Sequence, residues 1–204
     1  MIRIDKDEIF GLGACVRGMR NSFDSWNKSD SDGDHIGPAD YSLMKRLSRA
    51  GSSHAKFKRM IHVQCDVTAP LYWWKEFDTY KVGTVANSCS TMHTIANREF
   101  SREDFSTDHL YTDELGTLDT VIDALNGART LYLDGNRKND WWQLIQLLPS
   151  SYNQKRTIYL NYEVLSAIHK DRRNHKLDEW QVFCNWIEKL PYAEGVIFTK
   201  KEKA

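Results

Sequence analysis

Long apolar runs and an excess of charge are both missing from this chain. No apolar segment approaches the roughly 20 residues that a membrane-spanning helix needs, so we expect no membrane insertion. The 28 basic and 28 acidic residues cancel, which leaves no general field to attract nucleic acid or anionic lipid. The opening stretch MIRIDKDEIF is charged and lacks the apolar segment of a signal peptide. We therefore expect a soluble, cytoplasmic protein.

Paired cysteines and the common catalytic signatures are absent as well. The chain has four widely spaced cysteines, Cys15, Cys65, Cys89 and Cys184. Their spacing fits neither a CxxC pair nor a zinc site, and it predicts free structural thiols in a reducing compartment. There is no P-loop, no GxSxG and no HExxH, so classical hydrolase and nucleoside triphosphatase chemistry has no support.

One acidic segment resembles part of a calcium-binding loop. The sequence DSDGD covers residues 30–34, but alignment on Gly33 puts Lys28 at the first ligand position. The same alignment puts Ala39 where a carboxylate is required. We therefore predict a solvated loop here rather than a metal site.

The composition is that of a globular protein. Hydrophobic residues make up 41% and aromatic residues 12% of the 204, which is enough for a sizeable core. We expect a single domain over residues 1–204, with a polar, irregular and mobile excursion around 97–113.

The N-terminal half alternates strand and helix signals. Strict alternation of Ile61, Val63, Cys65 and Val67 predicts a half-buried strand that ends at Ala69-Pro70. The other expected elements are a short strand over 1–10, a helix over 11–20, a loop over 21–38, a helix over 39–50 that follows Pro38, and a helix over Leu71–Phe77.

The C-terminal half is mostly helical in pattern. Apolar residues recur at helical spacing over 114–127 and stop at Gly127. Residues 128–138 fit either a short strand or a continuation of that helix. We also expect an apolar segment over Trp141–Leu148 and helices over 158–170 and 176–190. The fold class is therefore α/β (α+β) and rich in helix.

Three features fit a binding site as well as an ordinary structural role. The polar tract from Thr79 to Ser90 is either a strand and turn or a loop that wraps a phosphate or flavin ring. The run from His169 to His175 either complements a helix dipole or supplies an anion-binding arginine. The pairs Trp73-Trp74 and Trp141-Trp142 each place one ring on the core and one elsewhere, at a subunit interface or as a stacking wall.

The order of these segments resembles the flavin-dependent thymidylate synthases. A turn that contains His54 is followed by a strand ending in Ala69-Pro70 and then by a helix that carries Glu76 at the family's glutamine. Thr79-Tyr80-Lys81 falls on the family's Arg-His-Arg triplet, and Asn87 and Ser90 match the Asn-Glu-x-Ser tract if one residue near Ala86 is inserted. Farther along, Leu148-Pro149 precedes Asn161, and Arg172 follows Asn161 by eleven residues, as in the family.

The resemblance implies a twisted sheet flanked by helices, in a homotetramer that holds FAD between subunits. It implies an enzyme that transfers hydride from NADPH to FAD and then makes dTMP from dUMP with methylenetetrahydrofolate. By position, Arg172 would be the catalytic residue that polarises the uracil ring, with Glu76 and Ser90 beside it at dUMP. The residues at FAD would be His54, Tyr80, Lys81, Asn87 and Asn161.

The chain also departs from the family pattern. The triplet keeps one cation, and Ser88 and Met92 replace the acid and the arginine of the following tract. Charge-assisted hydrogen bonds are worth about 1.5–3 kcal/mol each, so phosphate is held by other cations or the ligand differs. Two alternatives to a divergent synthase therefore stay open: a nucleotide- or flavin-binding protein without the chemistry, and a non-enzymatic interaction protein.

Overall fold

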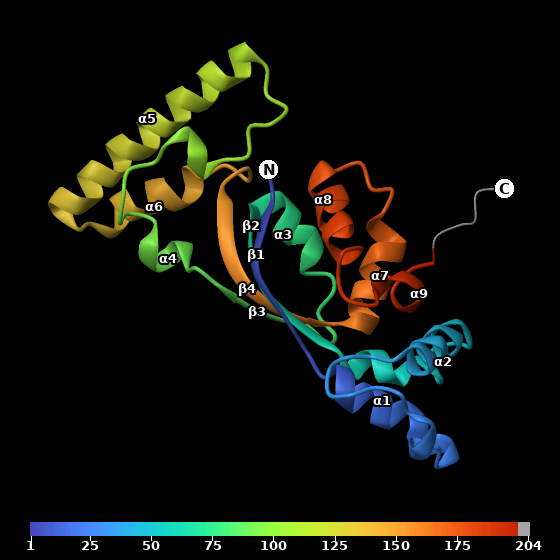
Figure 1. Cartoon of the computed structure of the whole chain (residues 1–204). Coiled ribbons are helices and arrows are strands. Elements are labelled where there is room, and N and C mark those ends of the chain that lie inside the picture. The colour runs from blue at the N-terminus through green and yellow to red at the C-terminus, as the bar shows by residue number, and fades with distance from the viewer. Residues whose placement is uncertain (200–204) are drawn as a thin grey trace. The chain divides into compact units, whose positions relative to one another are not determined.

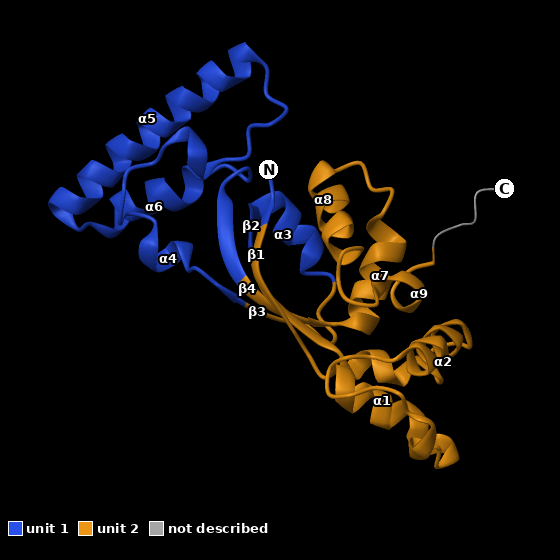
Figure 2. Cartoon of the chain, viewed as in Figure 1, with its two compact units in different colours: residues 1–3, 67–79, 87–156 blue, residues 4–66, 80–86, 157–204 orange. Residues whose placement is uncertain are grey.

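The computed structural model describes residues 1–199 and contains one mixed sheet-and-helix arrangement of the α/β class. The chain separates into two compact units (Figure 2). Unit 1 comprises residues 1–3, 67–79 and 87–156, and unit 2 comprises 4–66, 80–86 and 157–204, of which the structure describes those up to 199. None of the described helices is long and apolar enough to cross a membrane.

Four antiparallel strands form the sheet in the order β1-β2-β4-β3 (Figure 1). They are β1 (Arg3–Phe10), β2 (His62–Pro70), β3 (Val85–Ser88) and β4 (Asn153–Asn161). In β2, Val63, Cys65 and Val67 are buried while Gln64 is exposed, because successive side chains of a strand point to opposite faces. The predicted strands over 1–10 and 61–67 are confirmed.

The predicted helix over 158–170 is wrong in its first four residues. Ile158 and Leu160 lie in β4, both buried, with partly exposed Tyr159 between them. The helix α7 (Tyr162–Arg172) begins only after Asn161, whose side-chain oxygen accepts a hydrogen bond from the Val164 backbone amide at 3.0 Å. This N-cap is the position at which the alternating burial pattern of the strand ends and the helical pattern of α7 begins.

Unit 2 also holds three helices that the sequence predicts, α1 (Leu12–Arg20), α2 (Pro38–Arg49) and α8 (Asp178–Ile187). Two short helices of this unit were not predicted, the 3-10 helix η3 (Ala55–Met60) and α9 (Ala193–Val196). The helices α1 and α7 both contact η3, and α7 also contacts α8. The buried side chains of this unit include Met44, Ile61, Leu165, Trp180 and Phe183.

The loop between α1 and α2 is organised by one buried carboxylate. Asp40, fully buried, accepts hydrogen bonds from Arg20 Nε at 2.7 Å and from the hydroxyls of Ser29 and Ser31 at 2.6 and 2.7 Å. Asp30, within the acidic segment, accepts from the backbone amides of Ala39 and Asp40 at the start of α2. The segment therefore joins the two helices through side-chain hydrogen bonds.

In unit 1, the helix α3 (Leu71–Phe77) has the bounds that the sequence predicts. Trp73 and Trp74 are both buried, so the expectation that one ring of this pair lies away from the core is wrong. The indole of Trp74 donates to the Gln154 backbone oxygen at 2.9 Å, and the Arg156 guanidinium lies 4.3 Å from its ring centroid. The strand β4 covers this ring and makes it part of the core.

A helical hairpin forms the other part of unit 1. It consists of α5 (Thr112–Gly135) and α6 (Lys138–Leu147), and the short helix α4 (Thr91–Thr94) precedes it. The predicted stop at Gly127 is wrong, because the helix continues through the ambiguous stretch to Gly135 and ends at Asn136 with a φ of 46°. A glycine inside a helix costs about 1 kcal/mol relative to alanine, and packing of Leu118, Ile122 and Leu125 outweighs it.

The excursion around 97–113 is irregular, as predicted, and is anchored at its centre. Phe100 and Phe105 are buried in the same apolar cluster as Leu125. Ser101 and Asp104 form a capping box around the 3-10 helix η4 (Arg102–Asp104). Its mobility stays a prediction, as does the assignment of all 204 residues to a single domain.

Candidate functional site

Unit 2 brings two of the predicted site residues, Tyr80 and Arg172, into contact. The loop over 80–86 carries Tyr80, and the end of α7 carries Arg172. Arg172 Nε donates a hydrogen bond to the Tyr80 hydroxyl oxygen at 3.0 Å. The guanidinium also lies over the Trp180 ring, 4.9 Å from its centroid, and Trp180 packs edge-on against Tyr80. These contacts fix the plane of the guanidinium before any ligand arrives.

Asn161 meets the same loop through Gly83. Gly83 has a φ of 80°, and a β-carbon built there would lie 3.0 Å from Asn161 Nδ2 and 3.2 Å from Val164 Cγ2. The close approach and the left-handed backbone both favour glycine at this position. Because the side-chain oxygen Oδ1 of Asn161 caps α7, the side-chain nitrogen Nδ2 is the atom that faces the loop. Lys81 is exposed on the same loop.

His54 lies elsewhere in unit 2 and lines a cavity of about 900 Å³ between α1, α2 and η3. Arg20, Lys28, Arg46 and Lys56 line it with cationic side chains, and His54 adds an imidazole. Its apolar lining includes Phe23, Leu43, Leu47 and Phe57. We call this the unit 2 cavity.

The remaining predicted site residues belong to unit 1. Glu76 is half-buried in the last turn of α3, and Asn87 is exposed in β3. Ser90 is the residue before α4, and its backbone oxygen accepts the Thr94 hydroxyl at 2.8 Å. Cys89, next to it, bonds to β4 through its backbone amide and the Lys155 oxygen at 2.9 Å.

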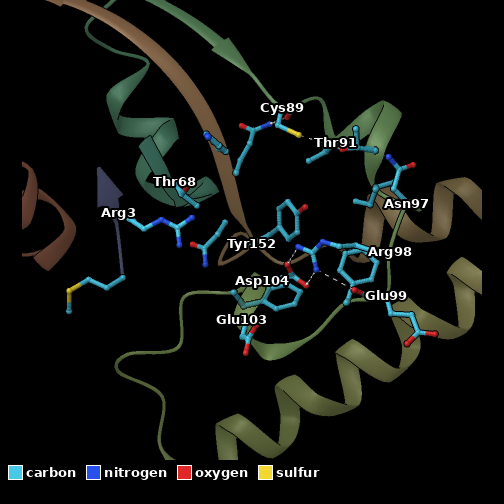
Figure 3. Close-up of a pocket in the computed structure, with 18 residues that line it drawn as sticks. Arg3, Thr68, Cys89, Thr91, Asn97, Arg98, Glu99, Glu103, Asp104 and Tyr152 are labelled. Carbon is cyan, nitrogen blue, oxygen red and sulfur yellow. Dashed lines mark hydrogen bonds and ion pairs between the residues drawn. The ribbon is translucent and has the colours of Figure 1, made fainter. Parts of the chain in front are cut away.

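A second cavity, of about 760 Å³, lies in unit 1 beside Ser90. In Figure 3, Tyr152, Arg98 and Asp104 lie near its centre and Cys89 and Thr91 lie at its upper edge. We call this the unit 1 cavity. The other lining residues whose side chains are charged are Arg3, Glu99, Glu103 and Lys155.

The charges in the unit 1 cavity are partly paired within the protein. Asp104 accepts from Arg98 Nη1 at 2.9 Å, from Arg98 Nη2, and from the Ser101 backbone amide. Burial and the nearby Asp104 carboxylate raise the pKa of Tyr152, so this phenol stays neutral at physiological pH. Sequence reasoning missed these residues, although Ser101 and Asp104 stand at the spacing of a capping box.

The thiols match the structural role predicted for them, except for Cys89. Cys15, Cys65 and Cys184 are free and buried, whereas Cys89 is free and exposed. Burial raises the pKa of Cys15 and of Cys65 to about 12, which makes both poor nucleophiles. Within residues 1–199, no cluster of three or more His, Cys, Asp or Glu side chains is arranged to hold a metal ion.

No protein-family model matches the sequence, and no curated protein matches it. Solved structures with the same architecture do match. Crystal structures of the flavin-dependent thymidylate synthase ThyX from Helicobacter pylori with FAD and dUMP superpose with TM-scores of 0.75 and 0.74, each at 17% identity. The first of them covers 97% of both chains. A UMP/dUMP methylase, PolB, from Streptomyces cacaoi bound to 5-Br dUMP reaches a TM-score of 0.64 at 14% identity, over 95% of this chain and 92% of that chain.

These matches define the class of protein by its fold. The antiparallel sheet with its surrounding helices is the α/β architecture of nucleotide-methylating enzymes of this type. More particularly, the chain has a divergent ThyX-like fold, which confirms the fold implied by the sequence resemblance.

Proposed function

We propose that this chain is a divergent flavin-dependent thymidylate synthase that methylates dUMP or a related pyrimidine nucleotide. The observation that carries the proposal is the orientation of Arg172. A guanidinium whose plane is fixed by a hydrogen bond from its Nε suits the negative charge that develops on a pyrimidine ring. The fold supports the proposal, because ThyX structures with FAD and dUMP align over nearly the whole chain.

The other roles follow from position. Glu76 and Ser90 bind the pyrimidine nucleotide, and His54, Tyr80, Lys81, Asn87 and Asn161 bind FAD. When bound, FAD supplies the hydride that it receives from NADPH, and methylenetetrahydrofolate supplies the carbon. The residues fit a flavin in two respects: Gly83 lets the 80–86 loop approach Asn161 closely, and His54 lines a cavity with both cationic and apolar walls. We also propose that the protein assembles as a homotetramer and works in the cytoplasm.

The protein's own residues bind and orient the nucleotide. Arg172 polarises the uracil ring, and Tyr80 and Trp180 hold Arg172 in place. Asn161 fixes the start of the helix that ends at Arg172, so the two predicted residues share one rigid element. Precise placement of such groups is what an enzyme of this kind needs.

A second candidate is a nucleotide- or flavin-binding protein that has lost the reaction. The segment over 88–92 favours this second candidate, because Ser88 and Met92 stand where the resemblance implies an acid and an arginine. A third candidate, a non-enzymatic interaction protein, predicts no small-molecule binding.

Three measurements separate these functions. A yellow purified protein with flavin absorbance supports either of the first two, whereas a colourless protein that shows no thermal shift with FAD or dUMP excludes both. Growth of a thymidine-requiring strain without thymidine then requires the complete reaction and distinguishes the first candidate from the second.

The assignment of Arg172 has its own test. Arg172→Ala is expected to abolish dUMP binding, measured by calorimetry, because the fork that recognises the ring is removed. Lys170→Ala, on an exposed position of the same helix, is the matched control and should bind dUMP as the wild type does. Unchanged affinity in Arg172→Ala would show that the positional assignment is wrong.

A further inference from the structure

Two residues of unit 1 that the proposed function gives to the nucleotide lie on separate segments. Glu76 stands in the last turn of α3, and Ser90 is the residue before α4. The chain between them leaves unit 1, because residues 80–86 belong to unit 2. The position of one residue relative to the other therefore depends on contacts outside the connecting segment.

Arg156 on β4 makes those contacts. Its Nη1 donates a hydrogen bond to Asp78 Oδ1 at 2.8 Å, and its Nε donates to Gln154 Oε1 at 3.0 Å. The guanidinium also lies 4.3 Å from the centroid of the Trp74 ring. Only 15% of the Arg156 side chain is exposed. A planar guanidinium with donors on two edges can bridge two partners in one fixed geometry, which the single amine of a lysine does not reproduce.

The contact with Asp78 anchors the end of α3. Asp78 is the first residue after the helix, and its backbone amide donates to the Trp74 backbone oxygen at 2.9 Å. Glu76 lies two residues before Asp78, and its backbone oxygen accepts the Thr79 hydroxyl at 2.8 Å. Arg156 therefore ties the turn that carries Glu76 to β4.

The contact with Gln154 anchors the segment before α4. Gln154 Nε2 donates to the Cys89 backbone oxygen at 2.9 Å, and the Cys89 backbone amide donates to the Lys155 oxygen at 2.9 Å. An amide side chain has one oxygen and one nitrogen, so the bond from Arg156 to the oxygen keeps the nitrogen turned toward Cys89. Ser90 follows Cys89 directly. Arg156 therefore acts on Ser90 through one intermediate side chain.

We propose that Arg156 is a positioning residue, which holds the Cys89-Ser90 segment in register with Glu76 and so sets the affinity of this part of the site for the nucleotide. It acts through Asp78 and Gln154 and needs no contact with the ligand. The inference rests on the proposed function, which assigns Glu76 and Ser90 to the nucleotide. Binding groups on separate segments are effective only when their relative placement is fixed.

The first experiment measures the mobility of the segment without any ligand. Cys89 is exposed and lies at the edge of the unit 1 cavity (Figure 3). The other thiols of the chain are buried: Cys15, Cys65 and Cys184. Arg156→Met keeps an unbranched stem and removes both donors, so maleimide labelling of Cys89 should become about threefold faster or more as the segment opens more often.

A double-mutant cycle shows whether Arg156 acts through Gln154. Gln154→Met should raise the labelling rate of Cys89 on its own, and Arg156→Met added to it should raise the rate no further. Arg137→Met is the matched control, because Arg137 forms an ion pair with Asp140 in the same unit and should leave the rate unchanged. Additive effects of the two variants, or an unchanged rate in Arg156→Met, would overturn the proposal.

The second experiment separates positioning from stability. Arg156→Met should weaken dUMP binding about tenfold by calorimetry, whereas Arg137→Met should bind as the wild type does. Arg156→Lys keeps a cation beside Asp78 but not the second, fixed contact with Gln154. We therefore expect Arg156→Lys to regain most of the midpoint of thermal unfolding while labelling stays fast and dUMP binding stays weak. If all three quantities recover together, the role of Arg156 is structural only.

Failure of the inference and failure of the proposed function give different results. A chain that binds dUMP, with the same affinity and labelling rate in Arg156→Met, keeps the proposed function and loses the positioning role. A wild-type chain that binds no dUMP overturns the nucleotide assignment, and the labelling cycle then still decides whether Arg156 holds the segment.

Discussion

The two cavities are similar in size and opposite in how their charges are arranged. In the unit 1 cavity, the lining residues Arg98 and Asp104 form an ion pair with each other. In the unit 2 cavity, Lys28, Arg46 and Lys56 line a partly open space, and no carboxylate among residues 1–199 lines it. Opposite charges that pair within the protein compensate each other, whereas like charges held together repel each other. The difference directs the search for an anionic ligand to unit 2.

The ion pairs behind the two cavities differ as well. The pair of Arg20 with Asp40 is buried on both sides, with 8% and 0% of the side chains exposed. In the pair of Arg98 with Asp104, the arginine is 68% exposed and the aspartate 7%. A buried pair depends on both partners, because removal of one leaves an uncompensated charge away from water.

The largest expected effect is on the stability of unit 2. Asp40→Asn should lower the free energy of unfolding by about 3–5 kcal/mol, because Arg20 loses its countercharge in a buried site. Asp104→Asn should lower it by about 1 kcal/mol, since water still reaches Arg98. Urea unfolding of the two variants measures both values, and equal losses would break the comparison between the units.

The same buried carboxylate gives a smaller, pH-dependent effect. Burial raises the pKa of Asp40, but hydrogen bonds from Ser29, Ser31 and Arg20 outweigh it and lower that pKa below its ordinary value of 3.8. The stability that Asp40 contributes is therefore present above pH 3.8 and is lost as pH falls through the lowered pKa. The gap in stability between wild type and Asp40→Asn should shrink as the pH is taken from 7 toward 3. A constant gap would show that Asp40 does not titrate in this way.

Much of the fold can be predicted from local sequence patterns. The bounds of α3 follow from Pro70 and the apolar run after it, and β2 follows from strict alternation. β4 escaped prediction because its first residues are polar and only Ile158 and Leu160 show the alternation before the helical pattern begins. The burial of Trp74 depends on Gln154 and Arg156, which are far away in the sequence, so no local pattern indicates it.

The candidate site is predictable only where spacing carries the information. Asn161 caps the start of α7 and Arg172 is its last residue, and the eleven-residue spacing between them is the signal that the resemblance used. The contact between Tyr80 and Arg172 joins residues 92 positions apart, and single-sequence patterns do not report such pairs. Both cavities are lined by several distant segments, which is why neither was predicted.

Arg172 is held in place by the hydrogen bond from its Nε to the Tyr80 hydroxyl and by its contact with the Trp180 ring. Tyr80→Phe removes the hydroxyl that accepts from its Nε and leaves the ring in place. We expect dUMP affinity to fall roughly tenfold, because hydrogen bonds to charged groups contribute about 1.5–3 kcal/mol. Tyr159→Phe, a phenol elsewhere in unit 2, serves as the control. Equal affinity in both variants, measured by calorimetry, would mean that the hydroxyl does not position Arg172.

The smallest expected effect tests the unit 1 cavity directly. Arg98→Gln removes a cation from that lining but leaves Lys28, Arg46 and Lys56 untouched. Affinity for FMN and for AMP, the two halves of FAD, should therefore stay within about twofold of wild type, since a charge paired with Asp104 is not available to a phosphate. Isothermal titration calorimetry with FMN and with AMP measures the two affinities. A tenfold loss of affinity in Arg98→Gln would reverse the comparison, because the phosphate would then bind in unit 1. The cations of the unit 2 cavity that make no ion pair within residues 1–199 would in that case need another explanation.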